Sequence, residues 1–363
     1  MQTKTYRDKD YVKTLAHRIH RIFPGRKLTI MEVCGTHTMA IARYGLRALL
    51  PSGLKLISGP GCPVCVTPAS VIDAALKLSE IPDTVICTFG DMMRVPGSRG
   101  SLELKRAEGS DIRVVYSVRD MLELAEKGPG RKFVFISVGF ETTTPGTALS
   151  VMEAAQMGLK NVFFLAANRL VVPAMDALMR SEEARIDGFL CPGHVSVIIG
   201  SGAYRGIAST YGVPCVVGGF EPVDILMAVH DIVDMAAQKK AGVGNAYPRA
   251  VTQQGNLRAQ DIMYQVFQPV AAEWRGLGKI PDSGMALREP YVHMDALKEF
   301  SLELSVVPDP AGCRCGDVLK GVILPPQCSL FGKRCRPEHP VGPCMVSSEG
   351  SCAAYYRYGG EEV

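Results

Sequence analysis

Short apolar runs alternate with amphipathic stretches along the first two-thirds of the chain. Runs rich in β-branched and aromatic residues predict strands at residues 28–33, 54–58, 84–89, 112–116, 132–138, 162–166 and 214–218. Between them, apolar residues at helical spacing predict helices at 38–50, 69–78, 147–155 and 171–180. This alternation is typical of βαβ units on parallel sheets, so the sequence predicts an α/β fold.

Two parts of this pattern resemble each other. Thr67-Pro68 follows a glycine-rich turn after one predicted strand, and Thr144-Pro145 follows a similar turn after another. In both places we expect the threonine to cap a helix and the proline to occupy its first position. The repeat predicts two similar parallel-sheet α/β domains, which we place at residues 26–130 and 131–230.

The two ends of the chain depart from this pattern. Amphipathic stretches predict helices at 11–23, 221–240, 257–267 and 295–300. The tail is rich in glycine and proline, and many of the twelve cysteines fall there: Cys313, Cys315, Cys328, Cys335, Cys344 and Cys352. Such a segment cannot build a core from apolar side chains alone, so metal or covalent cross-links must stabilise it. We expect a third, cysteine-rich domain formed by residues 1–25 and 231–363, with the helix at 11–23 packed against the tail.

Composition narrows the functional classes. The chain has 363 residues, 47 % of them hydrophobic, and no uninterrupted apolar stretch long enough for a membrane span. The charged N-terminus lacks the apolar core of a signal peptide, which predicts a cytoplasmic protein. In that reducing compartment, twelve cysteines favour metal or catalytic thiols over structural disulfides. The net charge of +4 is not concentrated in a block of lysine and arginine, so nucleic acid is not a predicted partner.

Cys34-Gly35-Thr36-His37 follows a predicted strand and opens a predicted helix. Ligand sites of open α/β sheets concentrate at such turns, at the carboxyl edge of the sheet. Amide groups at the start of a helix lower the pKa of a thiol, so we expect Cys34 to favour the thiolate, which binds metals or attacks as a nucleophile. His37 could donate a hydrogen bond, bind metal or transfer a proton. A buried cysteine beside a structural histidine is the other interpretation.

Cys62-Pro63-Val64-Cys65 lies in a glycine-rich turn before the helix predicted at 69–78. The spacing, with a proline between the cysteines, is typical of redox-active pairs in which a disulfide forms and breaks. A CxxC pair also donates two ligands in many zinc sites, but no second pair follows here at zinc-finger spacing. The sequence therefore favours a redox pair.

Other polar residues follow predicted strands and are candidates for the same sheet edge. Asp91 and Arg94 could bind a small anion or a partner chain, and Glu141 is suited to act as an acid, a base or an orienting group. His194 and Glu221 lie in later loops of the same kind. Salt bridges and helix capping explain Asp91, Arg94 and Glu141 equally well, and a lone residue such as His194 or Glu221 is more often structural than catalytic.

The six tail cysteines exceed the ligands of one metal site. A four-thiolate iron–sulfur cluster with one further pair would use all six, and a four-cysteine zinc site would also leave two over. Spacing alone does not distinguish these sites or identify the four ligands.

Taken together, the motifs resemble the HypD family of [NiFe]-hydrogenase maturation proteins. The resemblance runs from about residue 32 to residue 358 and rests on CGTH at 34–37, GPGCPVC at 59–65, TFGDMMRVPGS at 88–98, GFETTTP at 139–145, PGHV at 192–195, GGFEP at 218–222 and CMVSSEG at 344–350. Each motif alone is weak, but the ordered set is highly specific.

The resemblance implies roles for individual residues. Cys34 would be the thiolate that binds the iron of an Fe(CN)2CO group, with His37 beside it, and Cys62 and Cys65 would be the nearby redox pair. Four tail cysteines would bind a [4Fe–4S] cluster, namely Cys313, Cys328, Cys335 and Cys352. The remaining two, Cys315 and Cys344, would form a dithiol beside the cluster, as in ferredoxin–thioredoxin reductase.

The resemblance also implies a redox-active scaffold rather than an enzyme of conventional turnover. The Fe(CN)2CO group would be assembled on it with a small partner, HypC, and with cyanide from HypE. We expect electrons to pass from the cluster through Cys315 and Cys344 to Cys62 and Cys65 by thiol exchange. Two other classes compete: an iron–sulfur thiol–disulfide oxidoreductase of the ferredoxin–thioredoxin reductase type, and a zinc-stapled interaction protein.

Overall fold

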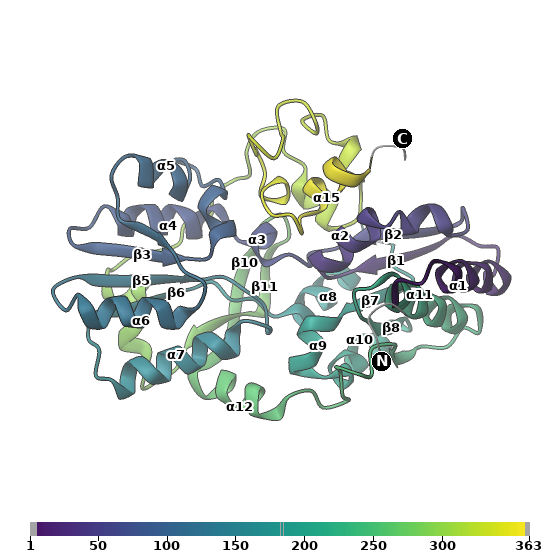
Figure 1. Cartoon of the computed structure of the whole chain (residues 1–363), viewed down its shortest axis with the longest axis horizontal. Coiled ribbons are helices and arrows are strands. Elements are labelled where there is room, and N and C mark those ends of the chain that lie inside the picture. Colours follow the sequence, from purple (N-terminus) through teal and green to yellow (C-terminus); the bar gives the residue numbers. More distant parts are fainter. Residues whose placement is uncertain (1–5, 182, 184, 360–363) are drawn as a thin grey trace.

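The computed structural model describes residues 6–181, 183 and 185–359. It contains two parallel sheets covered by helices, and the cysteine-rich tail lies beside the junction between them (Figure 1). The α/β class is confirmed, and each strand predicted from the sequence lies in one of the two sheets.

The first sheet has four parallel strands in the order β4-β3-β5-β6. Its strands are β3 (Thr84–Thr88), β4 (Ile112–Val114), β5 (Lys132–Ser137) and β6 (Val162–Ala166). Figure 1 shows helices on both faces, namely α4 (Ala69–Ser79) and α5 (Leu102–Ala107) on one and α6 (Val118–Lys127) and α7 (Thr144–Gln156) on the other. Burial on both faces explains the apolar runs at the centres of β3 and β5, at residues 85–87 and 133–136.

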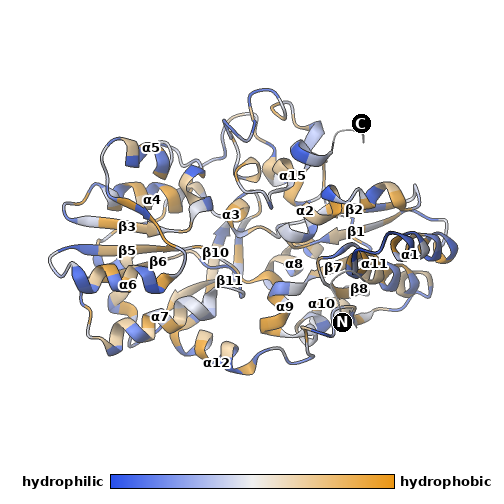
Figure 2. Cartoon of the chain, viewed as in Figure 1, coloured by the Kyte–Doolittle hydropathy of each residue, from blue (hydrophilic) through white to orange (hydrophobic). Residues whose placement is uncertain are grey.

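Helix α6 shows how these helices attach to the sheet. Hydrophilic and hydrophobic residues lie side by side along it (Figure 2). The apolar residues Val118, Met121, Leu122 and Ala125 recur at helical spacing and are buried. Ser117 and Asp120 form a capping box that fixes the first turn.

The second sheet has five parallel strands in the order β2-β1-β7-β8-β9. Its strands are β1 (Leu28–Glu32), β2 (Leu54–Ser58), β7 (Gly188–Pro192), β8 (Pro214–Gly218) and β9 (Gly242–Asn245). On one face, α1 (Lys9–Ile22) and α11 (Pro222–Ala237) complete an apolar core. On the other face, the core includes α8 (Val171–Arg180) and α10 (Arg205–Tyr211).

The two sheets do not follow the predicted ranges 26–130 and 131–230. Strands β1 and β2 come from the first range but pair with β7 and β8 from the second. The chain leaves the five-stranded sheet after β2, builds the four-stranded sheet, and then returns at β7. A local repeat cannot reveal this order, because a parallel strand can find its partner far along the chain.

The N-terminal helix does not pack against the tail as expected. Leu15 and Ile19 of α1 are buried with residues of β1, β2 and α11. The tail packs instead on α2 (Gly35–Arg43) and α3 (Pro63–Val66), partly through its last helix, α15 (Ser351–Tyr358). The predicted third range also contains residues 1–5 and 360–363, which lie outside the described residues.

A β-hairpin joins the two sheets and was missed by the sequence pattern. Strands β10 (Phe267–Trp274) and β11 (Gly278–Leu287) are antiparallel. The hairpin is preceded by α12 (Leu257–Val266) and followed by α13 (Ala296–Glu299). Arg275, next to β10, donates its backbone N–H to the Val66 carbonyl at 2.9 Å, which links the hairpin to α3.

The two Thr-Pro pairs are similar, but not as helix caps. The Thr67 hydroxyl donates to the Pro63 carbonyl at 2.8 Å, and the Thr144 hydroxyl donates to the Phe140 carbonyl at 2.9 Å. Each threonine therefore closes the turn before its helix, and no side chain caps α4 or α7.

Among the residues that the structure describes, no helix combines the length and the apolar character needed to cross a membrane.

Candidate functional site

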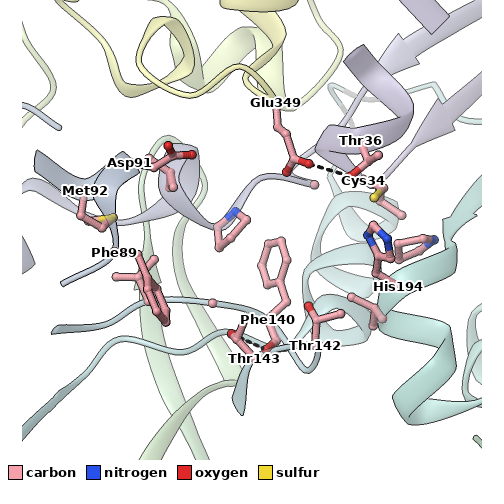
Figure 3. A pocket seen from close by; sticks show the side chains of 18 of the residues that line it. Cys34, Thr36, Phe89, Asp91, Met92, Phe140, Thr142, Thr143, His194 and Glu349 are labelled. Atoms are coloured by element: carbon pink, nitrogen blue, oxygen red, sulfur yellow. Dashed lines mark hydrogen bonds between the residues drawn. The ribbon is translucent and has the colours of Figure 1, made fainter. Parts of the chain in front are cut away.

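A cavity of about 450 Å3 lies at the carboxyl edges of both sheets. In an open parallel sheet, ligands bind where the strand order reverses, which is between β1 and β7 in one sheet and between β3 and β5 in the other. The loops after all four of these strands line the cavity (Figure 3), through residues such as Cys34, His194, Asp91 and Phe140. Both reversal points therefore contribute to one cavity, which is the candidate functional site.

Cys34 lies in this cavity, between the end of β1 and the start of α2. The Gly35 N–H donates to the Gly61 carbonyl at 2.9 Å, so the two glycine-containing turns pack tightly together. A Cβ added to Gly61 would lie 2.1 Å from the Cys34 nitrogen. Glycine is therefore required at position 61 for the CxxC turn to approach Cys34.

The Cys34 thiol is buried, and this overturns the expectation of a thiolate. Burial, with a smaller contribution from the nearby Glu349 carboxylate, raises the pKa of Cys34 to about 12. The backbone amides of Thr36 and His37 do lower the pKa of this thiol, as expected at the start of a helix, but burial outweighs them.

A buried carboxyl group fixes the backbone on which Cys34 sits. Glu32 accepts hydrogen bonds from the Cys34 N–H at 3.3 Å and from the Thr38 hydroxyl at 2.5 Å. Burial raises the pKa of Glu32 to about 7. This role could not be predicted from the sequence, because Glu32 lies inside a predicted strand.

His37 points away from the cavity, whereas His194 lines it. The His37 Nε2 lies 2.9 Å from the Gly219 carbonyl, and burial lowers the pKa of His37 to about 4, so the ring is neutral. Phe220 contacts both histidines, with ring centroids 5.0 Å from His37 and 4.0 Å from His194. His37 therefore supports the loop under His194 and does not face the cavity itself.

Residues 347–349 of the tail form a bridge segment across the cavity. At one end, the Ser347 hydroxyl donates to Asp91 Oδ2 at 2.9 Å. At the other end, the Thr36 hydroxyl donates to Glu349 Oε1 at 2.6 Å (Figure 3). Asp91 follows the four-stranded sheet and Thr36 follows the five-stranded sheet, so the bridge segment ties both sheets together over Cys34.

The remaining polar candidates form hydrogen bonds or ion pairs that hold parts of the chain together. Glu141 is buried outside the cavity lining, and its Oε1 accepts a hydrogen bond from the Val171 N–H at 3.0 Å, at the start of α8. Glu221 forms an ion pair with Arg7. Arg94 holds the tail by donating to the Pro337 carbonyl at 3.0 Å and the Val346 carbonyl at 3.4 Å.

The CxxC pair meets the tail cysteines. Cys62 precedes α3, Cys65 lies within it, and both are buried. The Cys65 thiol interacts with the thiols of Cys62 and Cys344, and burial raises its pKa well above the usual range. A redox pair and a tail thiol that are far apart in sequence are thus in contact.

The thiol contacts continue into the tail. Cys344 interacts with Cys315, and Cys315 interacts with Cys313 and Cys352. A Cβ added to Gly342 would lie 2.6 Å from the sulfur atoms of both Cys313 and Cys315. The absence of a side chain at Gly342 lets these two sulfurs lie on the same side of the loop.

The predicted cluster ligands are only partly gathered. Cys352 lies near both Cys313 and Cys335, whereas the Cys328 sulfur lies 3.9 Å from the Gly312 carbonyl at the surface. Within the described ranges, no group of three or more His, Cys, Asp or Glu side chains has the geometry of a metal-ion site. The all-thiol donor set suits an iron–sulfur cluster, and its ligands remain a prediction.

Comparison with known proteins identifies the family. Residues 10–359 match the family model described as HypD, Hydrogenase formation hypA family. The chain belongs to the HypD family. It is 45 % identical to Hydrogenase maturation factor HypD2 of Bradyrhizobium diazoefficiens, over 98 % of this chain and 96 % of the relative. It is 46 % identical to Hydrogenase maturation factor HypD of Escherichia coli K12, over 93 % of this chain and 91 % of the relative.

The HypD motifs found in the sequence converge on one place. The motifs that begin at residues 34, 59, 88, 139, 192 and 344 each contribute to the cavity lining. The motif that begins at residue 218 contributes Phe220, which packs behind His194. The motifs by which the family is recognised therefore build a single site.

Proposed function

We propose that this chain is a hydrogenase maturation factor, a scaffold on which the Fe(CN)2CO group of a [NiFe]-hydrogenase is assembled. HypC is its partner and HypE supplies the cyanide. Membership of the HypD family and the names of the relatives support the maturation role. The observation that carries the proposal is the position of Cys34, a cysteine in a cavity built by the reversal points of two sheets.

The cavity suits an iron cargo with diatomic ligands. Cys34 supplies a soft sulfur donor, and low-spin iron with cyanide and CO accepts such donors. The His194 ring and the Thr36 hydroxyl add polar groups to the lining, and Val138 and Phe140 add apolar walls that exclude water. A partner that brings a second thiolate would complete the donor set from the open side of the cavity.

We further propose a thiol relay from the tail to the cavity. The Cys344 thiolate attacks the Cys65 sulfur of a Cys62–Cys65 disulfide, and Cys62 leaves as a thiolate. Cys315 then attacks Cys344 in the mixed disulfide and releases Cys65. Two electrons and two protons thereby pass from one pair to the other, and the contact between Cys65 and Cys344 supports this exchange.

A [4Fe–4S] cluster on Cys313, Cys328, Cys335 and Cys352 would supply single electrons to the Cys315–Cys344 pair. The contacts of Cys315 with Cys313 and Cys352 support this assignment. Cys328 must turn inward from its position near the Gly312 carbonyl to join the set.

Infrared spectroscopy of the protein isolated anaerobically with HypC tests the scaffold role. We expect cyanide and CO stretching bands with the natural sequence and their loss in Cys34→Ser. Cys87→Ala is the matched control, because Cys87 is buried on β3 in the core beneath α6. Bands that persist in Cys34→Ser would overturn the proposal.

Disulfide trapping tests the relay separately. In a Cys62→Ser, Cys315→Ser double variant, mild oxidation should join Cys65 to Cys344, since neither retains its usual exchange partner. Peptide mass spectrometry detects this bond. A different pairing of Cys65 would rule the relay out and would leave the scaffold role untouched.

The alternative, a general thiol–disulfide oxidoreductase, requires external disulfides to reach these thiols. Cys62, Cys65, Cys315 and Cys344 are each at most 6 % exposed. Burial favours an internal relay that serves the cavity. Reduction of unrelated protein disulfides at a comparable rate, without HypC, would support the alternative instead.

A further inference from the structure

A second cavity, of about 330 Å3, lies apart from the first. Its walls are the start of α4, the end of β6, the β10–β11 hairpin, α13 and residues 304–306. The two cavities share no lining residue. Neither the proposed iron chemistry nor the thiol relay uses this space.

Arg169 is the unusual residue of this second cavity. Its side chain is buried, with the residue only 5 % exposed, and it donates to two backbone carbonyls, Asn168 at 3.1 Å and Glu273 at 2.9 Å. Within the described part of the chain, its Nε has no hydrogen-bond partner and no carboxylate lies within ion-pair distance. Burial lowers the pKa of Arg169 only to about 10, so the guanidinium stays charged at neutral pH.

A buried guanidinium without a paired anion is unfavourable, because its charge loses hydration without an equal replacement. Glu273 lies near enough to raise the pKa of Arg169 but forms no ion pair with it. Asp295 also lines the cavity, and its Oδ1 already accepts the Leu297 N–H at 2.9 Å, so it caps α13. Among the described residues, neither carboxylate of the cavity wall, Glu273 or Asp295, is therefore bonded to the Arg169 guanidinium.

Two further features make this space attractive to an anion. Helix α4 begins at the cavity wall after Pro68, and among the residues that the structure describes no side chain caps its first turn. Uncapped amides at the start of a helix carry partial positive charge and bind anions. Lys279, an exposed residue at the rim, adds a full positive charge.

We propose that this cavity binds a small metabolite through a carboxylate or phosphate group, with Arg169 as the main partner of that oxyanion. The planar guanidinium offers several N–H donors in a geometry that matches such groups. The volume lies at the lower end of the range of about 300–1,000 Å3 for small-molecule sites, which indicates a compact ligand. The Ser70 and Ser305 side chains at the wall provide further polar contacts.

The single tryptophan gives a direct readout. Trp274 is buried on β10, next to Glu273 in the cavity wall. We would titrate the full chain with inorganic phosphate, and separately with malonate, at constant ionic strength and follow tryptophan fluorescence. A saturable change with phosphate indicates a phosphorylated ligand, and one with malonate indicates a carboxylate; either supports the proposal.

Variants locate the binding event. Arg169→Gln should weaken binding at least about tenfold, which corresponds to about 1.4 kcal/mol. Lys279→Gln should weaken it by a smaller factor, and it keeps the test valid if circular dichroism shows that Arg169→Gln does not fold. Lys298→Gln is the matched control, because Lys298 is exposed on the neighbouring α13 and does not line the cavity.

Trp274 also stacks on Phe140, which lines the first cavity, so an anion bound there would change the fluorescence too. The Arg169 and Lys279 variants distinguish the two cavities, because neither residue lines the first. The proposal is overturned if neither anion gives a saturable change. It is equally overturned if Lys298→Gln weakens binding as much as Lys279→Gln does.

Discussion

At the scale of single residues, burial determines the charge of the groups around the first cavity. It raises the pKa of Cys34 to about 12 and of Glu141 to about 7, and it lowers the pKa of His37 to about 4. In each case the neutral form is favoured, because a charged group in the interior loses its hydration. The folded chain therefore favours the neutral form of the Cys34 thiol, whereas its place at the start of a helix had suggested a thiolate.

Glu141 predicts that stability depends on pH. Its pKa in the folded chain, about 7, exceeds the ordinary value of 4.5, so the unfolded chain releases this proton first. The free energy of unfolding should fall as the pH rises between these two values, by roughly 3 kcal/mol in total. Below this pH range the carboxyl group is protonated in both states, and the free energy of unfolding is not reduced. Above this range the reduction is complete.

Urea unfolding at about pH 5 and about pH 8 measures this effect. We expect Glu141→Gln to show a smaller loss of stability with rising pH than the natural sequence, because glutamine does not ionise. Glu126→Gln, an exposed change on α6, should lose as much stability with rising pH as the natural sequence does. An equal loss of stability between the two pH values in all three proteins would contradict the prediction.

Adding one methyl group at Gly61 should strongly destabilise the folded chain. An alanine Cβ there would meet the backbone of Cys34, at 2.1 Å from its nitrogen and 2.4 Å from its Cα, and neither atom can rotate away. We expect Gly61→Ala to lower the free energy of unfolding by about 3 kcal/mol or more, as overpacking does in tight interiors.

Gly146→Ala is the comparison for Gly61→Ala. Gly146 lies in α7 with no atom within 4 Å of an added Cβ. Alanine there should stabilise the chain by about 0.5–1 kcal/mol, because it favours the helix. Chemical denaturation of both variants provides the measurement, and similar losses in both would show that the close approach of Gly61 to Cys34 is unimportant.

The residue roles that could be predicted are those set by local sequence. Cys34 lies on a strand-to-helix turn, as its flanking residues indicated. Glu349 could not be found in this way, because its partner Thr36 is 313 positions away. His37 was placed beside the iron site by its neighbour in the motif, but the helix turns its ring toward Gly219 and leaves the cavity to His194.

At the scale of elements, the bridge segment 347–349 is the contact that closes the site. It is held by Asp91 on one side and by Thr36 on the other. Both bonds involve side-chain hydroxyls, and such neutral or charge-assisted bonds contribute about 0.5–3 kcal/mol each.

Removing both hydroxyls should loosen the bridge segment. In a Thr36→Val, Ser347→Ala double variant, we expect faster hydrogen–deuterium exchange in residues 344–350 while the strands keep their protection. Ser209→Ala is the control, because Ser209 is exposed and bonds only within its own helix, to the Gly206 carbonyl. Unchanged exchange in residues 344–350 would show that other contacts hold the segment.

Elements with strong periodicity were predicted well. Helix α8 and strand β6 have the bounds expected from the sequence, Val171–Arg180 and Val162–Ala166. Strands β7 and β9 were missed, because β7 contains glycine, cysteine and proline and β9 reads Gly-Val-Gly-Asn. These strands are specified by pairing with β8 and not by local propensity.

At the scale of the whole molecule, the two sheets are interleaved along the chain. Residues 26–130, which were predicted to form one domain, contain β1 and β2 without their neighbour β7, and β3 and β4 without their neighbour β5. An isolated fragment of this range would expose strand edges and apolar faces that are paired and buried in the full chain.

We therefore expect residues 26–130 alone to show no cooperative thermal unfolding, in contrast to the full chain. Circular dichroism during heating and the dispersion of the amide NMR spectrum measure this. A sharp thermal transition with well-dispersed resonances would show that the range is an autonomous unit after all.

The crossings between the sheets limit how cargo can enter. The polypeptide passes from one sheet to the other after β2, after β6 and again before α12, which packs on α7. Several connections between the sheets must change conformation together, so they restrict a relative rotation more than a single hinge would. We therefore expect loading and release to proceed by a small local displacement at the rim, at a pace set by side-chain contacts and not by rotation of one lobe against the other.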